Sequence, residues 1–186
     1  MEVMKRSQRI HATWAMVAVL CLILGIVIGQ SLSKRAATGI VLDGNACDAR
    51  CTRVIDGDTI VVSVNGVTEK VRLLGIDAPE PRRHARLPEQ AKKLGVTEEA
   101  VLALGNRATD KMISLVQGKR VNLVFPQREV SRDSFGRLLC YVEVDGVDVG
   151  ERMLLFGLAT LYETKHPRGK KYAIVRSTAQ RTKTAF

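Results

Sequence analysis

Histidine and cysteine, which often ligate transition metals, are scarce in this sequence, with three and four copies among 186 residues. Cys47 and Cys51 are closely spaced, but no histidine lies near them in sequence, so a metal site is the least favoured interpretation. A short-loop disulfide, which an oxidising compartment would permit, and a pair of free thiols are the alternatives. Cys140 alternates with apolar residues in a predicted strand, so we expect it in the core. The chain has no internal repeats, and its length is typical of one globular domain.

Charge is absent from residues 12–29, which read ATWAMVAVLCLILGIVIG. As a helix this run would be about 27 Å long, close to the apolar thickness of a bilayer, and it has no polar face. We therefore predict a transmembrane or signal-anchor helix at 12–29, after a basic flank at 1–11 and before a linker at 30–46. Three basic residues precede the run and two follow it, which favours an extracytoplasmic domain. A signal peptide cleaved near Ser31–Ser33, giving a secreted protein, is the alternative.

Basic residues outnumber acidic residues both in residues 1–39 and in the rest of the chain. The net charge is +10, and residues 1–39 hold five basic residues and one acidic residue. The remainder of the positive charge therefore belongs to residues 40–186, which makes anionic partners plausible. A basic balance is also an ordinary route to solubility, so charge by itself does not identify a partner.

Residues 47–186 are predicted to form one α+β domain of short strands with interposed helices. Asn65-Gly66 separates two apolar runs and indicates a β-hairpin in which Thr59 pairs with Arg72. Thr97 followed by two glutamates indicates a helix start. Two further strands, a short apolar helix and a weakly helical tail are expected at 120–125, 137–144, 150–159 and 170–183. This order of elements predicts a small β-barrel with attached helices.

The hairpin carries charged residues at both ends. Packing of a hairpin requires only apolar residues, so it does not explain these charges. Its register brings Asp58 and Asp77 side by side, provided that the chain turns at Gly75. Carboxylates and backbone carbonyls are the ligands that Ca²⁺ prefers, and residues 77–80 are expected to form a turn that offers both. Arg72 and Arg137 add guanidinium groups suited to phosphate. A metal, a carboxylate and two arginines together make a phosphodiesterase set.

Five segments in this order, VIDGDTI, VRLLGIDAPE, ALGNRATDKM, DSFGR and GLATLY, resemble the staphylococcal nuclease (thermonuclease) family over roughly residues 52–180. The resemblance implies a five-stranded OB-fold barrel with about three helices. It also implies a Ca²⁺-dependent nuclease that cuts DNA and RNA by water attack on phosphorus.

Residue by residue, the resemblance assigns roles to eight positions. Asp58 and Asp77 would supply the Ca²⁺ carboxylates, and Ala78 would ligate through its backbone carbonyl, so the family's usual Thr is not required there. Glu80 would activate or orient the water, and Arg72 and Arg137 would bind phosphate. Phe135 and Tyr162 would contact the substrate through their rings.

The sequence departs from the family pattern in the segment after Glu80, which is longer and rich in basic residues. We expect Arg82–Lys93 to supply non-specific affinity for nucleic acid rather than chemistry. The rival interpretations are a catalytically silent nucleic-acid-binding module and a membrane-tethered domain that binds protein. The complete set of charged side chains at the hairpin argues against a silent module.

Overall fold

The computed structural model describes residues 40–162 and 165–184. These residues belong to one compact unit, which begins at Ile40. The predicted membrane or signal helix at 12–29, its basic flank and residues 30–39 of the predicted linker lie outside the described residues. Within the two described ranges, no helix is long and apolar enough to cross a membrane.

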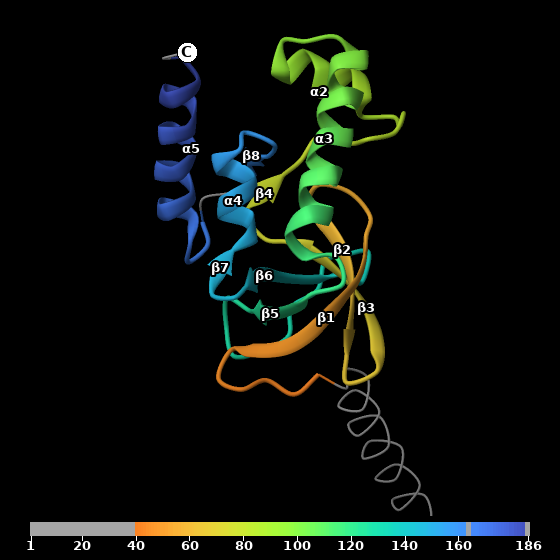
Figure 1. The fold of residues 1–186 in the computed structure, drawn as a ribbon, viewed down its shortest axis with the longest axis vertical. Helices are drawn as coiled ribbons and strands as arrows, with labels where there is room; N and C mark the ends of the chain where they lie inside the picture. The colour runs from red at the N-terminus through yellow and green to blue at the C-terminus, as the bar shows by residue number, and fades with distance from the viewer. Residues whose placement is uncertain (1–39, 163–164, 185–186) are drawn as a thin grey trace, which may run out of the picture. The chain divides into compact units, whose positions relative to one another are not determined.

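A five-stranded mixed barrel forms the centre of this unit (Figure 1). Neighbouring strands pair antiparallel in the order β3-β2-β1-β5-β6, and β6 closes the barrel by pairing with β3 in parallel. The barrel strands are β1 (Ala46–Val54), β2 (Thr59–Val64), β3 (Val67–Leu73), β5 (Arg120–Val124) and β6 (Leu138–Val144). Three two-residue strands complete the sheets: β7 (Val147–Asp148) extends β6, while β4 (Ile76–Asp77) pairs with β8 (Thr160–Leu161).

Four helices lie within the described ranges, against about three that the resemblance implied. They are α2 (Leu87–Leu94), α3 (Glu98–Val116), α4 (Val149–Leu155) and α5 (Gly169–Thr184). Helix α2 lies in the longer basic segment that follows Glu80, and it packs on α3 through a small apolar cluster of its own. The predicted start of α3 is confirmed, because the Thr97 hydroxyl accepts a hydrogen bond from the backbone N–H of Ala100 at 3.2 Å.

The predicted hairpin is confirmed in its register. Thr59 lies opposite Arg72, and the turn residues Asn65 and Gly66 have φ angles of 50° and 83°. At the other end of β3, Gly75 has a φ of 85°, a conformation that glycine adopts without steric cost, and the chain turns there as predicted. The turn predicted at 77–80 is wrong in detail. Asp77 ends β4, and residues 78–80 have no regular structure.

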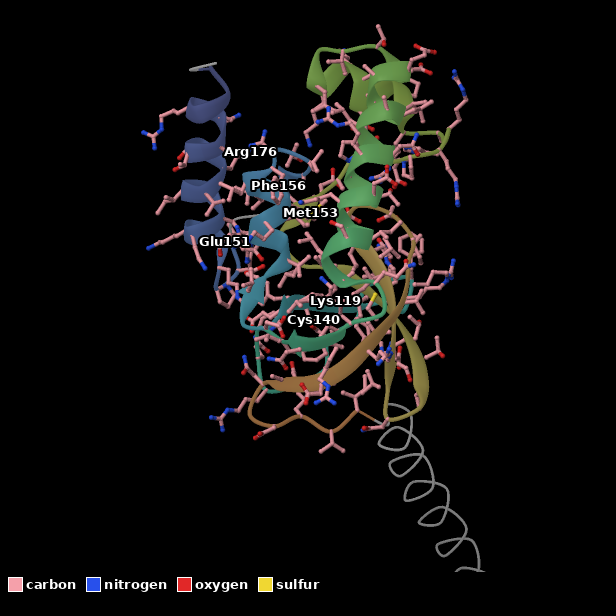
Figure 2. The ribbon with its side chains drawn as sticks, in the orientation of Figure 1. Lys119, Cys140, Glu151, Met153, Phe156 and Arg176 are labelled. Atoms are coloured by element: carbon pink, nitrogen blue, oxygen red, sulfur yellow. The ribbon has the colours of Figure 1, made fainter. Side chains whose placement is uncertain are left out.

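Strand β1, which contains Cys47 and Cys51, was not predicted from the sequence. Both cysteines are buried and free, so the disulfide hypothesis is wrong. Four residues of extended strand span about 13 Å, whereas a disulfide joins Cα atoms less than about 7 Å apart. Cys140 is fully buried on β6, as expected (Figure 2). Burial raises the pKa of all three thiols, which keeps them protonated and unreactive.

The segments at the ends of the hairpin pack closely against helix α3. Two glycines, Gly57 and Gly105, permit this close packing. A Cβ at Gly57 would lie 2.6 Å from the Cβ of Ala78 and 2.7 Å from that of Ala108 on α3. A Cβ at Gly105, also on α3, would overlap the backbone of Glu80. The turn before β2 and the segment after β4 are therefore both held against one helix.

Candidate active site

One open cavity of about 830 Å³ lies where the ends of β2, β3 and β4 meet the loop before β6. Each of these elements contributes charged side chains to its wall. Seven of the eight predicted site residues line it: Asp58, Arg72, Asp77, Glu80, Phe135, Arg137 and Tyr162. The eighth, Ala78, is buried beside Asp77. Residues from separate parts of the sequence thus meet around one space.

Arg72 is the centre of the deepest part of this cluster. Its guanidinium forms an ion pair with Asp58 and donates a hydrogen bond to Asp77 Oδ1 at 2.9 Å. Asp58 is fixed from its other side as well, because its Oδ2 accepts the backbone N–H of Ala78 at 2.7 Å. Thr59 donates its hydroxyl to Asp58 Oδ1 at 3.0 Å. The carboxylates of Asp58 and Asp77 therefore share the Arg72 guanidinium. Their side chains are only 7% and 21% exposed, respectively.

Asp56 is a cavity residue to which the sequence analysis gave no role. Its Oδ1 accepts the backbone N–H of Asp58 at 3.0 Å, which shapes the turn before β2. Burial raises the pKa of Asp56, while hydrogen bonding with Thr59 and the charge of Arg72 oppose the rise. Burial also lowers the pKa of Arg72, against the charges of Asp77 and Asp56. The signal in the sequence was the Asp-x-Asp spacing directly before a strand.

Arg137 is held by the loop that begins at Asp133. Asp133 accepts the side-chain Nε–H of Arg137 at 2.7 Å and the backbone N–H groups of Phe135 and Arg137 at 2.9 Å and 3.0 Å. These hydrogen bonds, together with the charge of Arg137, lower the pKa of Asp133 in spite of burial, which raises it. The carboxylate therefore fixes the loop and aims the guanidinium at the cavity.

Two aromatic rings stand at the edge of the cavity. Phe135 is 83% exposed, with the Arg137 guanidinium carbon 5.3 Å from its ring centre. Tyr162 is 69% exposed, and its backbone N–H donates to the carbonyl of Gly75 at 3.1 Å. This hydrogen bond continues the pairing of β8 with β4 and sets the position of Tyr162.

Glu80 reaches the cavity from the irregular segment that packs on Gly105. Its Oε1 lies 3.8 Å from Nη2 of Arg86, and its side chain is 36% exposed. Glu80 is thus the more accessible carboxylate, in contrast to the nearly buried Asp58. This difference suits Glu80 for contact with water and Asp58 for a structural or ligand role.

A hard divalent cation requires several oxygen ligands. No group of three His, Cys, Asp or Glu side chains in the described ranges is placed to hold a metal. Asp58 and Asp77 nevertheless reach the same cationic group, and the acidic groups around them offer only oxygen ligands. Ca²⁺ fills the rest of its shell with backbone carbonyls and waters, so the residues fit Ca²⁺ rather than a transition metal.

Comparison with known proteins identifies the family of this chain. Residues 70–185 match the family described as "Staphylococcal nuclease homologue". The match covers more than half of the chain, so the protein belongs to the staphylococcal nuclease family. Asp56 and Asp58 precede the matched residues, and their place in the site rests on the geometry described above.

Among individual relatives, the chain is 36% identical over 118 residues to Endonuclease YncB of Bacillus subtilis, covering 63% of this chain and 49% of the relative. It is 35% identical over 123 residues to the SPbeta prophage-derived endonuclease YokF of the same organism, covering 66% and 37%. The Thermonuclease of Staphylococcus intermedius is 27% identical over 165 residues, covering 89% and 86%. The chain therefore spans half or less of the two Bacillus relatives.

Proposed function

We propose that this chain is a Ca²⁺-dependent phosphodiesterase that hydrolyses DNA, RNA or both by water attack on phosphorus. One observation carries the proposal: a single open cavity collects acidic residues, arginines and exposed rings from separate parts of the fold. Carboxylates without arginines would suit a metal site alone, and arginines without carboxylates would suit a binding site alone. The combination, in a member of the staphylococcal nuclease family, supports hydrolysis.

The proposed roles combine the resemblance to the family with the environment of each side chain. Asp58, Asp77 and the carbonyl of Ala78 would hold Ca²⁺, which supplies positive charge next to the phosphate. Glu80 is the exposed carboxylate and would accept the proton of the attacking water as the new P–O bond forms. Arg72 and Arg137 would donate to phosphate oxygens whose charge grows as the old P–O bond breaks. In the structure both guanidiniums are held in position by carboxylates.

The finer assignment of the barrel belongs to the same proposal. We assign it to the OB-fold class, because five strands close in a mixed barrel through one parallel pair, β3 with β6. Phe135 and Tyr162 lie exposed at the cavity, where rings can stack on nucleic-acid bases. Their exposure would otherwise be unfavourable for large rings.

We propose further that the domain is extracytoplasmic and stays attached to the membrane through residues 12–29. The support is the length and lack of charge of that run in the sequence. Mass spectrometry of the mature protein is expected to find residues 12–29 still present. A mature N-terminus near Ser33 or Lys34 would instead show a secreted protein whose signal has been removed.

The experiment that tests the nuclease proposal is a cleavage assay on single- and double-stranded DNA and on RNA, with Ca²⁺ and with a chelator. We expect cleavage of at least one substrate in Ca²⁺ and none in chelator. A wild-type protein that binds nucleic acid without cutting it in Ca²⁺ would refute the proposal and leave a binding module.

A further inference from the structure

Two basic side chains in the cavity wall, Lys70 and Arg86, differ from Arg72 and Arg137 in their contacts with carboxylates. Arg72 and Arg137 each contact a carboxylate at less than 3 Å. Arg86 has only the 3.8 Å contact with Glu80, and its side chain is 63% exposed. Lys70 also lines the cavity, and it makes no salt bridge with a described residue. These two cations are therefore free to meet an anionic ligand.

Lys70 and Arg86 reach the cavity from different elements. Lys70 lies two residues before Arg72 on β3, so strand geometry places both on one face, about 6.8 Å apart along the strand. Arg86 comes from the start of α2, next to Glu80. The positive charge of the cavity wall thus extends beyond Arg72 and Arg137, the two arginines that would bind one phosphate.

We propose that Lys70 and Arg86 bind phosphates adjacent to the scissile one, so that the preferred substrate is a strand of several successive phosphates. This proposal rests on the proposed nuclease function. On binding, the Arg86 guanidinium exchanges its long 3.8 Å contact with Glu80 for a phosphate. Lys70 and Arg86 then contribute to substrate affinity and leave the chemical step unchanged.

The basic segment itself supplies a matched control. Arg83 lies three residues before Arg86, but it is paired with Glu98 at 3.3 Å and Glu99 at 3.2 Å and does not line the cavity. Arg82 is exposed and is also absent from the cavity wall. If the segment provided only diffuse positive charge, Arg82→Gln and Arg86→Gln would have the same effect. Phosphate contacts in the cavity predict that they differ.

The test compares cleavage of a thymidine dinucleotide, which has a single phosphodiester, with that of an oligothymidylate of about ten residues. The full chain and its Lys70→Gln, Arg86→Gln and Arg82→Gln variants are assayed in Ca²⁺. At about 0.1 M salt, loss of one phosphate contact to a single strand lowers affinity about fivefold. Lys70→Gln and Arg86→Gln should each raise KM for the oligonucleotide by about that factor, while kcat and the dinucleotide KM stay constant. Arg82→Gln should change the oligonucleotide KM by much less.

A second readout separates phosphate contacts from other effects. In the Glu80→Gln background, the slope of log affinity against log salt for the oligonucleotide should fall by about 0.7 with each lost contact. Equal changes for both substrates, no change, or an effect equal to that of Arg82→Gln would overturn the proposal. A loss of kcat at constant KM in Arg86→Gln would show instead that Arg86 acts on Glu80. If the wild type cleaves neither substrate, the nuclease function itself fails, which is a different result from an active wild type with indifferent variants.

Discussion

Two clusters in this domain combine buried aspartate with arginine, and only one of them lines the candidate active site. In the first, Arg72 contacts Asp58 and Asp77, and Asp56 lies close enough for its charge to act on Arg72. In the second, Arg168 contacts Asp148 and Glu143, each at 2.6 Å. Both clusters pair one arginine with carboxylates, so the difference between the clusters lies in how their charges are compensated.

The charged groups of the Arg168 cluster have ionic and hydrogen-bonding partners within the protein. Asp148 is 6% exposed and also accepts the hydroxyl of Tyr172 at 2.9 Å and the backbone N–H of Glu151 at 3.1 Å. The second of these contacts caps the N-terminus of α4. Arg168 lies over the ring of Tyr141, 4.2 Å from its centre. Burial and the Asp148 carboxylate raise the pKa of Tyr172, so it remains a donor throughout the ordinary pH range. The cluster thereby connects α4 and α5 with β6.

In the Arg72 cluster, Asp58 has comparable donors, the Thr59 hydroxyl and the Ala78 backbone N–H, but three carboxylates surround the one arginine, those of Asp56, Asp58 and Asp77. The Arg168 cluster has two carboxylates for its arginine. A buried charge that is not fully compensated is costly, and proteins retain such an excess where a ligand completes it. We therefore propose that the Arg168 cluster stabilises the fold and that the Arg72 cluster binds a cation. Substitutions in and around the two clusters should therefore have different consequences for activity and for stability.

Glu80→Gln is expected to produce the largest functional change. The amide keeps the size of the side chain but cannot accept the proton of water, so kcat should fall by about 100-fold or more. The free energy of unfolding should stay close to that of the wild type, because Glu80 is partly exposed and has only one long ionic contact. Cleavage kinetics and urea denaturation of the same preparation check both statements. A variant with unchanged kcat would remove Glu80 from the mechanism.

Asp148→Ala is expected to produce the largest loss of stability. It leaves the Arg168 charge short of a partner and removes the cap of α4, which should cost about 3 kcal/mol in the free energy of unfolding. The matched control is Glu151→Ala, because Glu151 lies on the same helix, α4 (Figure 2), and forms an ion pair with Lys171 of α5. That exposed pair should contribute less than about 1 kcal/mol. Equal losses in the two variants would contradict a structural role for the Arg168 cluster.

Gly105→Ala should lower cleavage activity because it displaces Glu80. The added methyl group overlaps the Glu80 backbone, which must move away from α3. A displacement of about 1 Å can reduce catalysis by up to about 100-fold, whereas alanine at a helical position otherwise favours the helix. The kcat of Gly105→Ala and its helix content by circular dichroism provide the check. Full activity would show that α3 does not position Glu80.

The smallest effect is expected for Asp133 and depends on pH. Its pKa in the folded chain is lower than the ordinary value of 3.8, so ionised Asp133 stabilises the fold above that value. This stabilisation is lost as the pH falls through the lowered pKa. Relative to Asp133→Asn, the wild type should be more stable by about 1 kcal/mol at neutral pH, and the difference should shrink below about pH 4. Urea denaturation across this range measures it, and a difference that grows in acid would contradict the assigned hydrogen bonds.

The parts of the fold that follow from local rules could be predicted from the sequence. Asn65-Gly66 fixed the hairpin register, Thr97 marked the start of α3, and Gly75 marked the turn that brings Arg72 to Asp77. Strand β1 escaped because its residues, ACDARCTRV, include small and charged types with little preference for strands. Its pairing with both β2 and β5 is what holds it extended.

The parts of the site that could not be predicted depend on contacts between distant segments. Gly105 permits the close approach of Glu80, and nothing local in the α3 sequence indicates this. Arg86 belongs to a basic segment in which several residues were equivalent by sequence, and only the packing of α2 directs it to the cavity. The alternation of β3 did carry a signal for Lys70, since it lies two residues from Arg72 on the same face.

We propose that the Arg72 cluster, and not the Arg168 cluster, binds the catalytic Ca²⁺. The most direct measurement is the Ca²⁺ concentration that gives half-maximal DNA cleavage in the wild type, Asp77→Ala and Asp148→Asn, each shown to be folded at the assay temperature. We expect the half-maximal concentration to rise about tenfold or more in Asp77→Ala, with rate partly recovered at high Ca²⁺, because one carboxylate ligand is lost. Asp148→Asn should match the wild type. An unchanged Ca²⁺ requirement in Asp77→Ala, or a shift in Asp148→Asn alone, would contradict the account.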